Sequence, residues 1–271
     1  MNAPDRFLLP DIQALTDLRN QPINRVGVKG LHYPVRLAMA DGSTQSTVAR
    51  ITMDVGLPAQ VKGTHMSRFV EVLESDPRLL DFASVQGMVM TMLTRLGAER
   101  GHIEFSFPCF ITKAAPVSGV KSLLDHAVVL RATIDPAEGY RLEVQVRVAA
   151  TSLCPCSKEI SEYGAHNQRS HITIAATLCG EMSIEELVRI AEEEASCEVY
   201  GLLKRPDEKF VTERAYDNPK FVEDLVRDVA VRLNIEPRVT CYTVTAENFE
   251  SIHNHSAYAV ITFDKNRGAA P

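Results

Sequence analysis

The segment from residue 152 to residue 171 holds the side chains with the clearest capacity for chemistry. Cys154 and Cys156 stand one residue apart, and His166 and His171 follow in the same segment. Thiolate and imidazole are the ligands of zinc and related transition metals, and three protein ligands leave one coordination position open for water. A bound metal lowers the pKa of that water and makes it a nucleophile at neutral pH. One interpretation of the segment is therefore a catalytic metal site.

Two other interpretations of the same residues stay open at this point. The cysteines fit equally well as small buried hydrophobic side chains at the end of a strand, with the histidines in an exposed loop. A redox pair is the third interpretation, although cysteines with one residue between them depart from the usual C-x-x-C arrangement. The spacing alone does not decide among the three.

Two further segments carry groups that would complete a site. Residues 204–217 include Glu208 and are expected to form a charged loop, longer than a connection between helices requires. Residues 251–255 include His253 and His255 between the last two expected strands, where paired histidines serve as ligands or acid–base groups. A solvated loop is the simpler interpretation of each segment.

Three basic side chains in the first half suit an anionic ligand. Lys62, His65 and Arg68 surround an expected helix start, where backbone N–H groups and positive charge favour anions. Ordinary capping and surface charge would explain them equally well. The sequence contains no glycine-rich phosphate loop, no nucleophile elbow and no dinucleotide fingerprint.

Hydrophobic periodicity and capping residues predict the elements that must hold these groups. Two strands are expected within residues 26–56, with a turn at Asp41-Gly42-Ser43. The other expected strands span residues 103–111, 127–134, 143–148, 171–178, 240–245 and 258–263. The expected helices span residues 66–75, 79–96 and 183–203, the last with a capping box at Ser183, and 218–233.

Each half of the chain repeats the order strand, strand, helix, helix, strand, strand. With 271 residues available, this order predicts two similar modules in tandem and an α+β fold class with antiparallel sheets and pairs of helices. The expected boundaries are an N-terminal arm over residues 1–25, a first module over 26–135, a second module over 136–264 and a C-terminal tail over 265–271. The second module carries most of the candidate site.

Composition excludes several classes of protein. Hydrophobic residues make up 45% and charged residues 24%, as in globular rather than disordered or fibrous chains. The net charge of −6 and the absence of Trp argue against a nucleic-acid partner, and the apolar runs are too short to span a membrane. The first residues lack the pattern of a secretory signal, so we expect a cytoplasmic protein with reduced cysteines.

Taken together, the segments described above resemble the type IB GTP cyclohydrolase family. The resemblance rests on Cys-Pro-Cys-Ser-Lys and Gly-Ala-His-Asn-Gln-Arg between Ser152 and Ser170, on Lys62 to Arg68, and on Ile252-His253-Asn254-His255. It spans almost the whole chain and implies tandem tunnelling-fold modules. It also implies a homo-oligomer, a tetramer, with sheets joined across subunits and active sites near the interfaces.

The same resemblance implies roles for individual residues at a metal. Cys154, His166 and Glu208 correspond to metal ligands, and Cys154 is also the family's catalytically important cysteine. His253 corresponds to a further ligand or to the proton-transfer group, and Cys156 belongs to the same catalytic motif. The resemblance implies one divalent metal per site, and sulfur, nitrogen and carboxylate ligands are compatible with zinc, iron or manganese.

For the substrate, the resemblance implies GTP. Glu223 corresponds to the glutamate that anchors the guanine edge, where a carboxylate accepts from both the ring N–H and the amino group. The cations available for the triphosphate are Lys62, His65, Arg68, Lys158 and Arg169. The negative net charge does not oppose such a ligand, because only the local field at the site matters.

The implied reaction converts GTP and water to 7,8-dihydroneopterin triphosphate and formate, the first step of tetrahydrofolate biosynthesis. Water attacks carbon 8 of guanine, the imidazole portion opens, formate leaves, and the remainder rearranges and closes. This chemistry needs an activated water and a proton shuttle. A product that stops at a cyclic phosphate is an open alternative.

Two other functions stay open on the same residues. In a tunnelling-fold enzyme such as a deazaguanine nitrile reductase, Cys154 would attack carbon and no metal would be required. A non-catalytic metal-binding or pterin-binding protein would instead unfold when its metal is removed. Metal dependence of activity separates these alternatives from a cyclohydrolase.

Overall fold

Ten strands form one continuous sheet in the computed structural model of the chain, which describes residues 12–13, 15–75 and 79–268. The strands are β1 Ile23–Ala38, β2 Thr44–Leu57, β3 Leu79–Leu80, β4 Gly101–Ala114, β5 Lys121–Asp135, β6 Gly139–Leu153, β7 Asn167–Leu178, β8 Cys197–Glu198, β9 Val239–Asn248 and β10 Ala257–Asp264. The helices of this part of the chain are α1 Met66–Ser75, α2 Phe82–Leu96, α3 Pro155–Ile160, α4 Ile184–Glu193, α5 Arg205–Asp217 and α6 Val222–Ile235.

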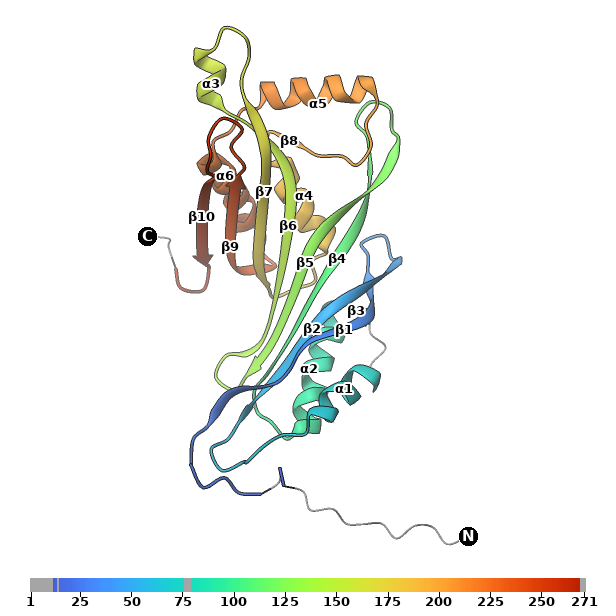
Figure 1. Cartoon of the computed structure of the whole chain (residues 1–271), viewed down its shortest axis with the longest axis vertical. Helices are drawn as coiled ribbons and strands as arrows, with labels where there is room; N and C mark the ends of the chain where they lie inside the picture. Colours follow the sequence, from blue (N-terminus) through green and yellow to red (C-terminus); the bar gives the residue numbers. More distant parts are fainter. Residues whose placement is uncertain (1–11, 14, 76–78, 269–271) are drawn as a thin grey trace.

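Within the sheet, strands from the first half of the chain neighbour one another, and so do strands from the second half. Its order is β10-β9-β7-β6-β5-β4-β2-β1-β3, with β8 paired to β6, and the long strands are all antiparallel (Figure 1). The short β3 pairs with β1 in parallel. The α+β class predicted from the sequence is thus confirmed. Strands β5 and β6 pair directly across the module boundary proposed between residues 135 and 136, so the sheet is continuous there. This boundary stays a prediction.

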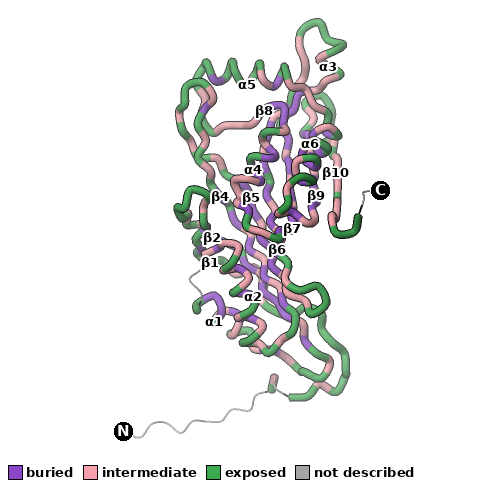
Figure 2. Tube along the Cα trace, turned by 180° about the vertical axis from the view of Figure 1, so that it is seen from behind, coloured by how far each residue is buried: buried purple, intermediate pink, exposed green. Residues whose placement is uncertain are grey.

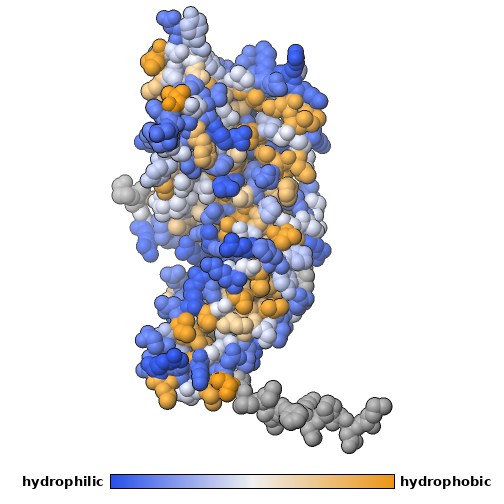
Figure 3. Space-filling view, in the orientation of Figure 1, coloured by the Kyte–Doolittle hydropathy of each residue, from blue (hydrophilic) through white to orange (hydrophobic). Residues whose placement is uncertain are grey.

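Among the described residues, helices cover one face of the sheet and leave the other face without helices (Figures 1 and 2). Along β6, which Figure 2 shows behind the helices, the alternating residues Val144, Val146 and Val148 are buried, whereas Arg147 is exposed. This alternation follows from the two-residue repeat of a strand. The face of the sheet seen in Figure 3 mixes hydrophilic and hydrophobic residues. The hydrophobic core therefore lies between the sheet and the helices of both halves.

Local signals in the sequence place several elements correctly. The hairpin between β1 and β2 turns at Gly42, whose φ of 80° lies in the left-handed region that glycine tolerates. Helix α1 spans the predicted residues 66–75. At the start of α4, Glu186 N donates to Ser183 Oγ at 3.2 Å and Ser183 N donates to Glu186 Oε2 at 2.8 Å, which confirms the predicted capping box.

Other boundaries differ from the prediction. Strand β1 begins at Ile23, inside the expected N-terminal arm, and α2 begins only at Phe82, because Leu79 and Leu80 form β3. Helix α4 ends at Glu193 rather than near residue 203, and β8 follows. Helix α6 begins at Val222, and Asn218 ends the preceding helix instead of starting this one.

The expected loop over residues 204–217 is wrong, since residues 205–217 form helix α5. Sequence periodicity fails here because only Asp207 and Ala215 of this helix are buried. The Asp207 carboxylate accepts hydrogen bonds from Val117 N and Ser118 N, both at 2.8 Å, from Ser118 Oγ at 2.6 Å and from Lys204 N at 2.8 Å. Contacts with the turn between β4 and β5 thus fix the first turn of α5.

His126 on β5 is a buried histidine with an unusual environment. It is 1% exposed and pairs with Cys109 on β4, and within the described part of the chain neither ring nitrogen has a hydrogen-bond partner. Burial and, secondarily, the charge of Lys113 lower the pKa of His126 to about 4. The imidazole is therefore neutral in the folded protein at pH 7.

Because of His126, acid should weaken the fold. Below about pH 6.5 the unfolded chain takes up a proton at this residue, whereas the folded chain does so only near pH 4. The free energy of unfolding should therefore fall by roughly 3 kcal/mol across this window. In urea unfolding at neutral pH and at about pH 4.5, His126→Leu should lack much of this loss, whereas His32→Gln, at an exposed position, should keep it. An equal acid loss in His126→Leu and wild type would contradict the prediction.

Candidate functional site

Cys154 lies where β6 ends and the short helix α3 begins. Its Sγ accepts a hydrogen bond from Ser157 N at 3.4 Å, so the side chain caps the helix. Pro155 follows at the first helical position, which its fixed φ favours. The sequence analysis predicted no helix between residues 148 and 171 and so missed α3. The cap sets the direction of the Cys154 side chain, and Cys156, one residue beyond Pro155, is exposed.

His166 lies beside Cys154 because the chain folds back after α3. Cys154 N donates to His166 O at 3.2 Å, and His166 N donates to Ser157 Oγ at 3.1 Å. Gly164, with a φ of 113°, takes a backbone conformation in this return that other residues adopt at a cost. The structure thus places Cys154 and His166, two residues of the predicted metal site, next to each other along the backbone.

His253 belongs to the exposed segment between β9 and β10, at the same end of the sheet. The segment is fixed at its start by Phe249 N, which donates to Arg169 O at 2.9 Å. It approaches the site through Ser251, whose Oγ lies 3.5 Å from His166 Nδ1. The rings of His253 and His255 stack with centroids 5.2 Å apart. His253 therefore belongs to the neighbourhood of His166.

Glu223 also lies at this end, in the first turn of α6. The start of α6 is tied to the site because Lys220 N donates to Leu153 O at 3.1 Å, next to Cys154. The Glu223 side chain is exposed and available to a ligand. An acid near a helix N-terminus is also favoured by the helix dipole.

Two of the proposed cations belong to the same region. Lys158, on α3, donates from Nζ to Tyr216 O and lies 4.3 Å from the centre of the Tyr216 ring. Arg169 is exposed on β7, three residues beyond His166. Because Lys158 is held by a neutral carbonyl and a ring, its charge is not cancelled by a carboxylate there.

Glu208 is not brought to Cys154 within one chain. It is exposed in the first turn of α5 and precedes Tyr216 by eight residues, about 12 Å along the helix. Among the described residues, no three His, Cys, Asp or Glu side chains are arranged to hold a metal ion. The chemistry of Cys154 and His166 fits a metal, but one chain in this conformation supplies an incomplete ligand set.

The other proposed cations lie at the opposite end of the sheet. The strand register places Val55, near the end of β2, at the same level of the sheet as Tyr140, near the start of β6. The pairing runs through one residue each on β4 and β5. From Tyr140 to Leu153 the strand advances roughly 40 Å. Lys62, His65 and Arg68 follow β2, so they lie at the end of the molecule remote from Cys154 (Figure 1).

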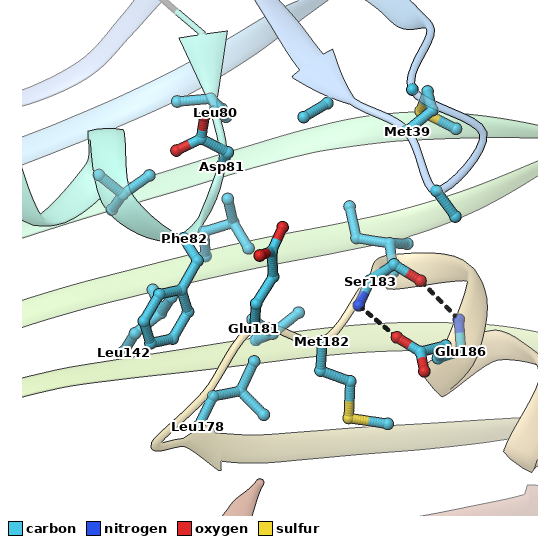
Figure 4. A pocket seen from close by; sticks show the side chains of 17 residues that line it. Met39, Leu80, Asp81, Phe82, Leu142, Leu178, Glu181, Met182, Ser183 and Glu186 are labelled. Carbon is cyan, nitrogen blue, oxygen red and sulfur yellow. Dashed lines mark hydrogen bonds between the residues drawn. The ribbon is translucent and has the colours of Figure 1, made fainter.

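A cavity of about 630 Å³ lies away from both groups, between the β1–β2 turn, the start of α2 and the start of α4 (Figure 4). Its floor is apolar, with Leu142, Leu178 and Met182 among the lining residues. The charged residues that line it are Asp81, Glu181 and Glu186, all acidic. Glu186 is paired with Arg238 at 3.0 Å, but Asp81 and Glu181 would repel a triphosphate, so this cavity does not suit GTP.

Sequence reasoning missed a group of polar side chains beneath the site. Ser152, Gln168, Ser170 and Asn248 are all buried on the helix-covered face of the sheet. A signal was present, because each residue is in phase with buried apolar residues of its own strand, such as Ile172 and Ile174 on β7. Buried polar groups at such positions require partners, which is a reason to examine them.

Comparisons with known proteins agree on one family. The family described as "Type I GTP cyclohydrolase folE2" matches residues 9–259. The chain is 60% identical over 263 residues to GTP cyclohydrolase FolE2 of Paraburkholderia xenovorans, covering 97% of each chain. It is 62% identical over 259 residues to GTP cyclohydrolase FolE2 1 of Dechloromonas aromatica, covering 96% of this chain and 97% of the relative.

Solved structures show a shared fold at low sequence identity. The uricase of Arthrobacter globiformis has a TM-score of 0.51 and 7% identity, with 92% of this chain and 96% of that chain covered. A highly active mutant of Bacillus sp. TB-90 urate oxidase also has a TM-score of 0.51, with 8% identity and coverage of 89% and 100%. These likenesses concern the fold alone and confirm the tunnelling fold. Within the described residues, no helix is long and apolar enough to cross a membrane.

Proposed function

The chain belongs to the type I GTP cyclohydrolase folE2 family and is a GTP cyclohydrolase of folate biosynthesis, and on that premise we propose that its site lies around Cys154 and His166. There, GTP and water would become 7,8-dihydroneopterin triphosphate and formate. The observation that supports this placement is the adjacency of Cys154 and His166, which are joined by the 3.2 Å hydrogen bond from Cys154 N to His166 O.

The family points to a divalent metal, and we propose Cys154 and His166 as its first two ligands. Sulfur and nitrogen donors at neighbouring positions suit zinc, iron or manganese. Such a metal, when bound, supplies an activated water. His253 is the proposed third ligand or the proton-transfer group, since its segment already touches His166. Glu208 joins the set only if α5 shifts or a neighbouring subunit supplies it.

The remaining groups at this end have roles that match a guanine nucleotide. Glu223 is placed to accept hydrogen bonds from the ring N–H and amino group of guanine, which holds the base in one orientation. Lys158 and Arg169 are the cations at this end for the triphosphate. As the ring opens and formate leaves, protons must be taken up and returned, and His253 is the proposed carrier, with Cys156 as a neighbouring thiol.

A complete site would need at least two subunits. Lys62, His65 and Arg68 lie roughly 40 Å from Cys154 along the sheet, much farther than one GTP molecule extends. These cations can therefore reach the same substrate only from another copy of the chain. We propose a homo-oligomer, a tetramer, in which opposite ends of two subunits meet at each site. The cytoplasm, which contains GTP, is the proposed location.

An anaerobic assay tests this function directly. Purified protein stripped of metal is incubated with GTP, with and without added Mn²⁺, Fe²⁺ or Zn²⁺, and formate and oxidised pterin fluorescence are followed. Because the proposed water is activated only on a metal, both signals should depend on metal addition. The folded state, checked by circular dichroism, should survive metal removal, since the core is built without the metal.

Other outcomes of the assay would overturn parts of the proposal. Formate without a fluorescent pterin would show that the reaction stops at another product. Turnover that survives exhaustive chelation would remove the metal and favour Cys154 as a nucleophile. Unfolding on chelation would instead indicate a structural metal.

A further inference from the structure

Four buried polar side chains form one connected group directly beneath the proposed metal site. Ser152 is 1% exposed, Gln168 8%, Ser170 0% and Asn248 4%. They come from the ends of β6, β7 and β9, and the strand register places Ser152 opposite Gln168 and Ser170 opposite Asn248. Burying polar side chains at the ends of three strands costs free energy of folding unless each of them has a hydrogen-bond partner.

The contacts within this group lead to His166. Gln168 Oε1 lies 3.0 Å from His166 Nδ1, and Gln168 Nε2 donates to Ser152 Oγ at 3.0 Å. The Ser170 hydroxyl lies 2.8 Å from Ser152 Oγ and 2.7 Å from Asn248 Oδ1. One chain of hydrogen bonds thus runs from the His166 imidazole through Gln168 on β7 to Ser152 on β6, and then through Ser170 on β7 to Asn248 at the end of β9.

The contact with Gln168 determines which nitrogen of His166 is available. An amide oxygen only accepts hydrogen bonds, so a neutral His166 facing Gln168 Oε1 must carry its proton on Nδ1. The lone pair then lies on Nε2, the nitrogen directed away from Gln168. We infer that Gln168 is a positioning residue that fixes this tautomer and the ring orientation, so that His166 presents Nε2 to the metal. This inference rests on the function proposed above.

The contact with Ser152 supports this orientation of Gln168. If the amide were reversed, its NH₂ group would face Nδ1, and His166 would have to carry its proton on Nε2, where no lone pair would remain for a metal. With Nε2 of Gln168 engaged by Ser152 Oγ, the amide oxygen stays directed at His166. The link through Ser170 to Asn248 also ties this arrangement to the strand that precedes the His253 segment.

The tautomer can be observed without metal and without turnover. In metal-free protein with ¹⁵N-labelled histidine, long-range ¹H–¹⁵N correlation spectra distinguish the two tautomers, and His166→Ala identifies the His166 signals. Wild-type His166 should be protonated on Nδ1. Gln168→Leu should lose this preference, whereas Gln168→Glu should retain it, because a carboxylate oxygen also accepts from Nδ1–H.

Metal affinity gives the second measurement, by titration of metal-stripped protein with Zn²⁺. Loss of such an orienting partner typically weakens metal binding about 10–100-fold, and this is the effect expected for Gln168→Leu. Gln168→Glu should restore affinity to within a few-fold of wild type. Tyr242→Phe is the matched control, because it removes the hydrogen bond from the Tyr242 hydroxyl on β9 to Asn234 of α6, away from His166. It should leave Zn²⁺ affinity unchanged.

The outcomes separate this inference from the proposed function. If His166→Ala binds Zn²⁺ as wild type does, His166 is not a ligand and the proposed site is wrong. If His166→Ala loses Zn²⁺ while Gln168→Leu binds it normally, the site stands and the role of Gln168 is overturned. A wild-type His166 protonated on Nε2 would overturn that role even if Gln168→Leu failed to fold.

Discussion

Exchange of Cys154 or His166 for alanine should lower kcat with GTP by at least about three orders of magnitude, because each change removes a ligand of the proposed metal and with it the activated water. The protein should stay folded, since Cys154 and His166 are only partly buried and outside the hydrophobic core. Turnover is measured as formate release, and folding by circular dichroism and thermal unfolding.

A remote cysteine provides the control for this prediction. Cys179 is an exposed cysteine that follows β7 at the opposite end of that strand from His166. Cys179→Ala should therefore turn over GTP at the wild-type rate. Near-wild-type turnover in Cys154→Ala or His166→Ala would refute the assignment of these residues to the metal.

Two inactive variants should restore activity when they assemble together. The double variant Lys62→Ala/Arg68→Ala alters only the end of the molecule at which β2 ends. The variant Cys154→Ala alters only the opposite end, at which β6 ends. If each site combines opposite ends from two chains, about one site in four receives two intact ends in a random equal mixture. Hetero-oligomers purified after co-expression with different tags should then show about a quarter of wild-type activity.

The parent variants provide the controls for complementation. Each variant expressed alone should be inactive, and each should elute in size-exclusion chromatography like wild type. Mixed oligomers that remain inactive would show that the two ends do not share a site. Full activity of Lys62→Ala/Arg68→Ala alone would instead show that these cations do not serve the substrate.

Much of the secondary structure could be predicted because its causes are local. The hairpin at Gly42, the strict alternation on β6 and the capping box of Ser183 and Glu186 depend on residues close together in the chain. Predictions failed where distant contacts decide. Helix α5 lacks an apolar stripe, and its first turn is held by Asp207 through bonds to Val117 and Ser118, about ninety residues away.

In the candidate site, too, some features could be predicted from local sequence and others could not. Residue types and spacing between Cys154 and His166 indicated metal chemistry, and strand β6 and the turn after α3 place the two residues side by side as that interpretation requires. The contact between Gln168 and the His166 ring joins residues two apart in the chain, but no local pattern could show that Gln168 is held by Ser152, because that contact depends on the register between β6 and β7. Nor could a pattern show that Glu208 lies in the first turn of α5, about 12 Å along the helix from Tyr216, the residue that contacts Lys158.

The sequence by itself determined the kinds of chemistry available to this protein and the family to which it belongs, because ligand types and short motifs are carried by neighbouring residues. The tertiary structure alone decided the distances. It separated Lys62, His65 and Arg68 from Cys154 by the length of a strand, since fourteen-residue and fifteen-residue strands are rigid spacers whose register fixes both ends. Side-chain identity specifies what a group can do, and long-range strand pairing specifies which groups can do it together.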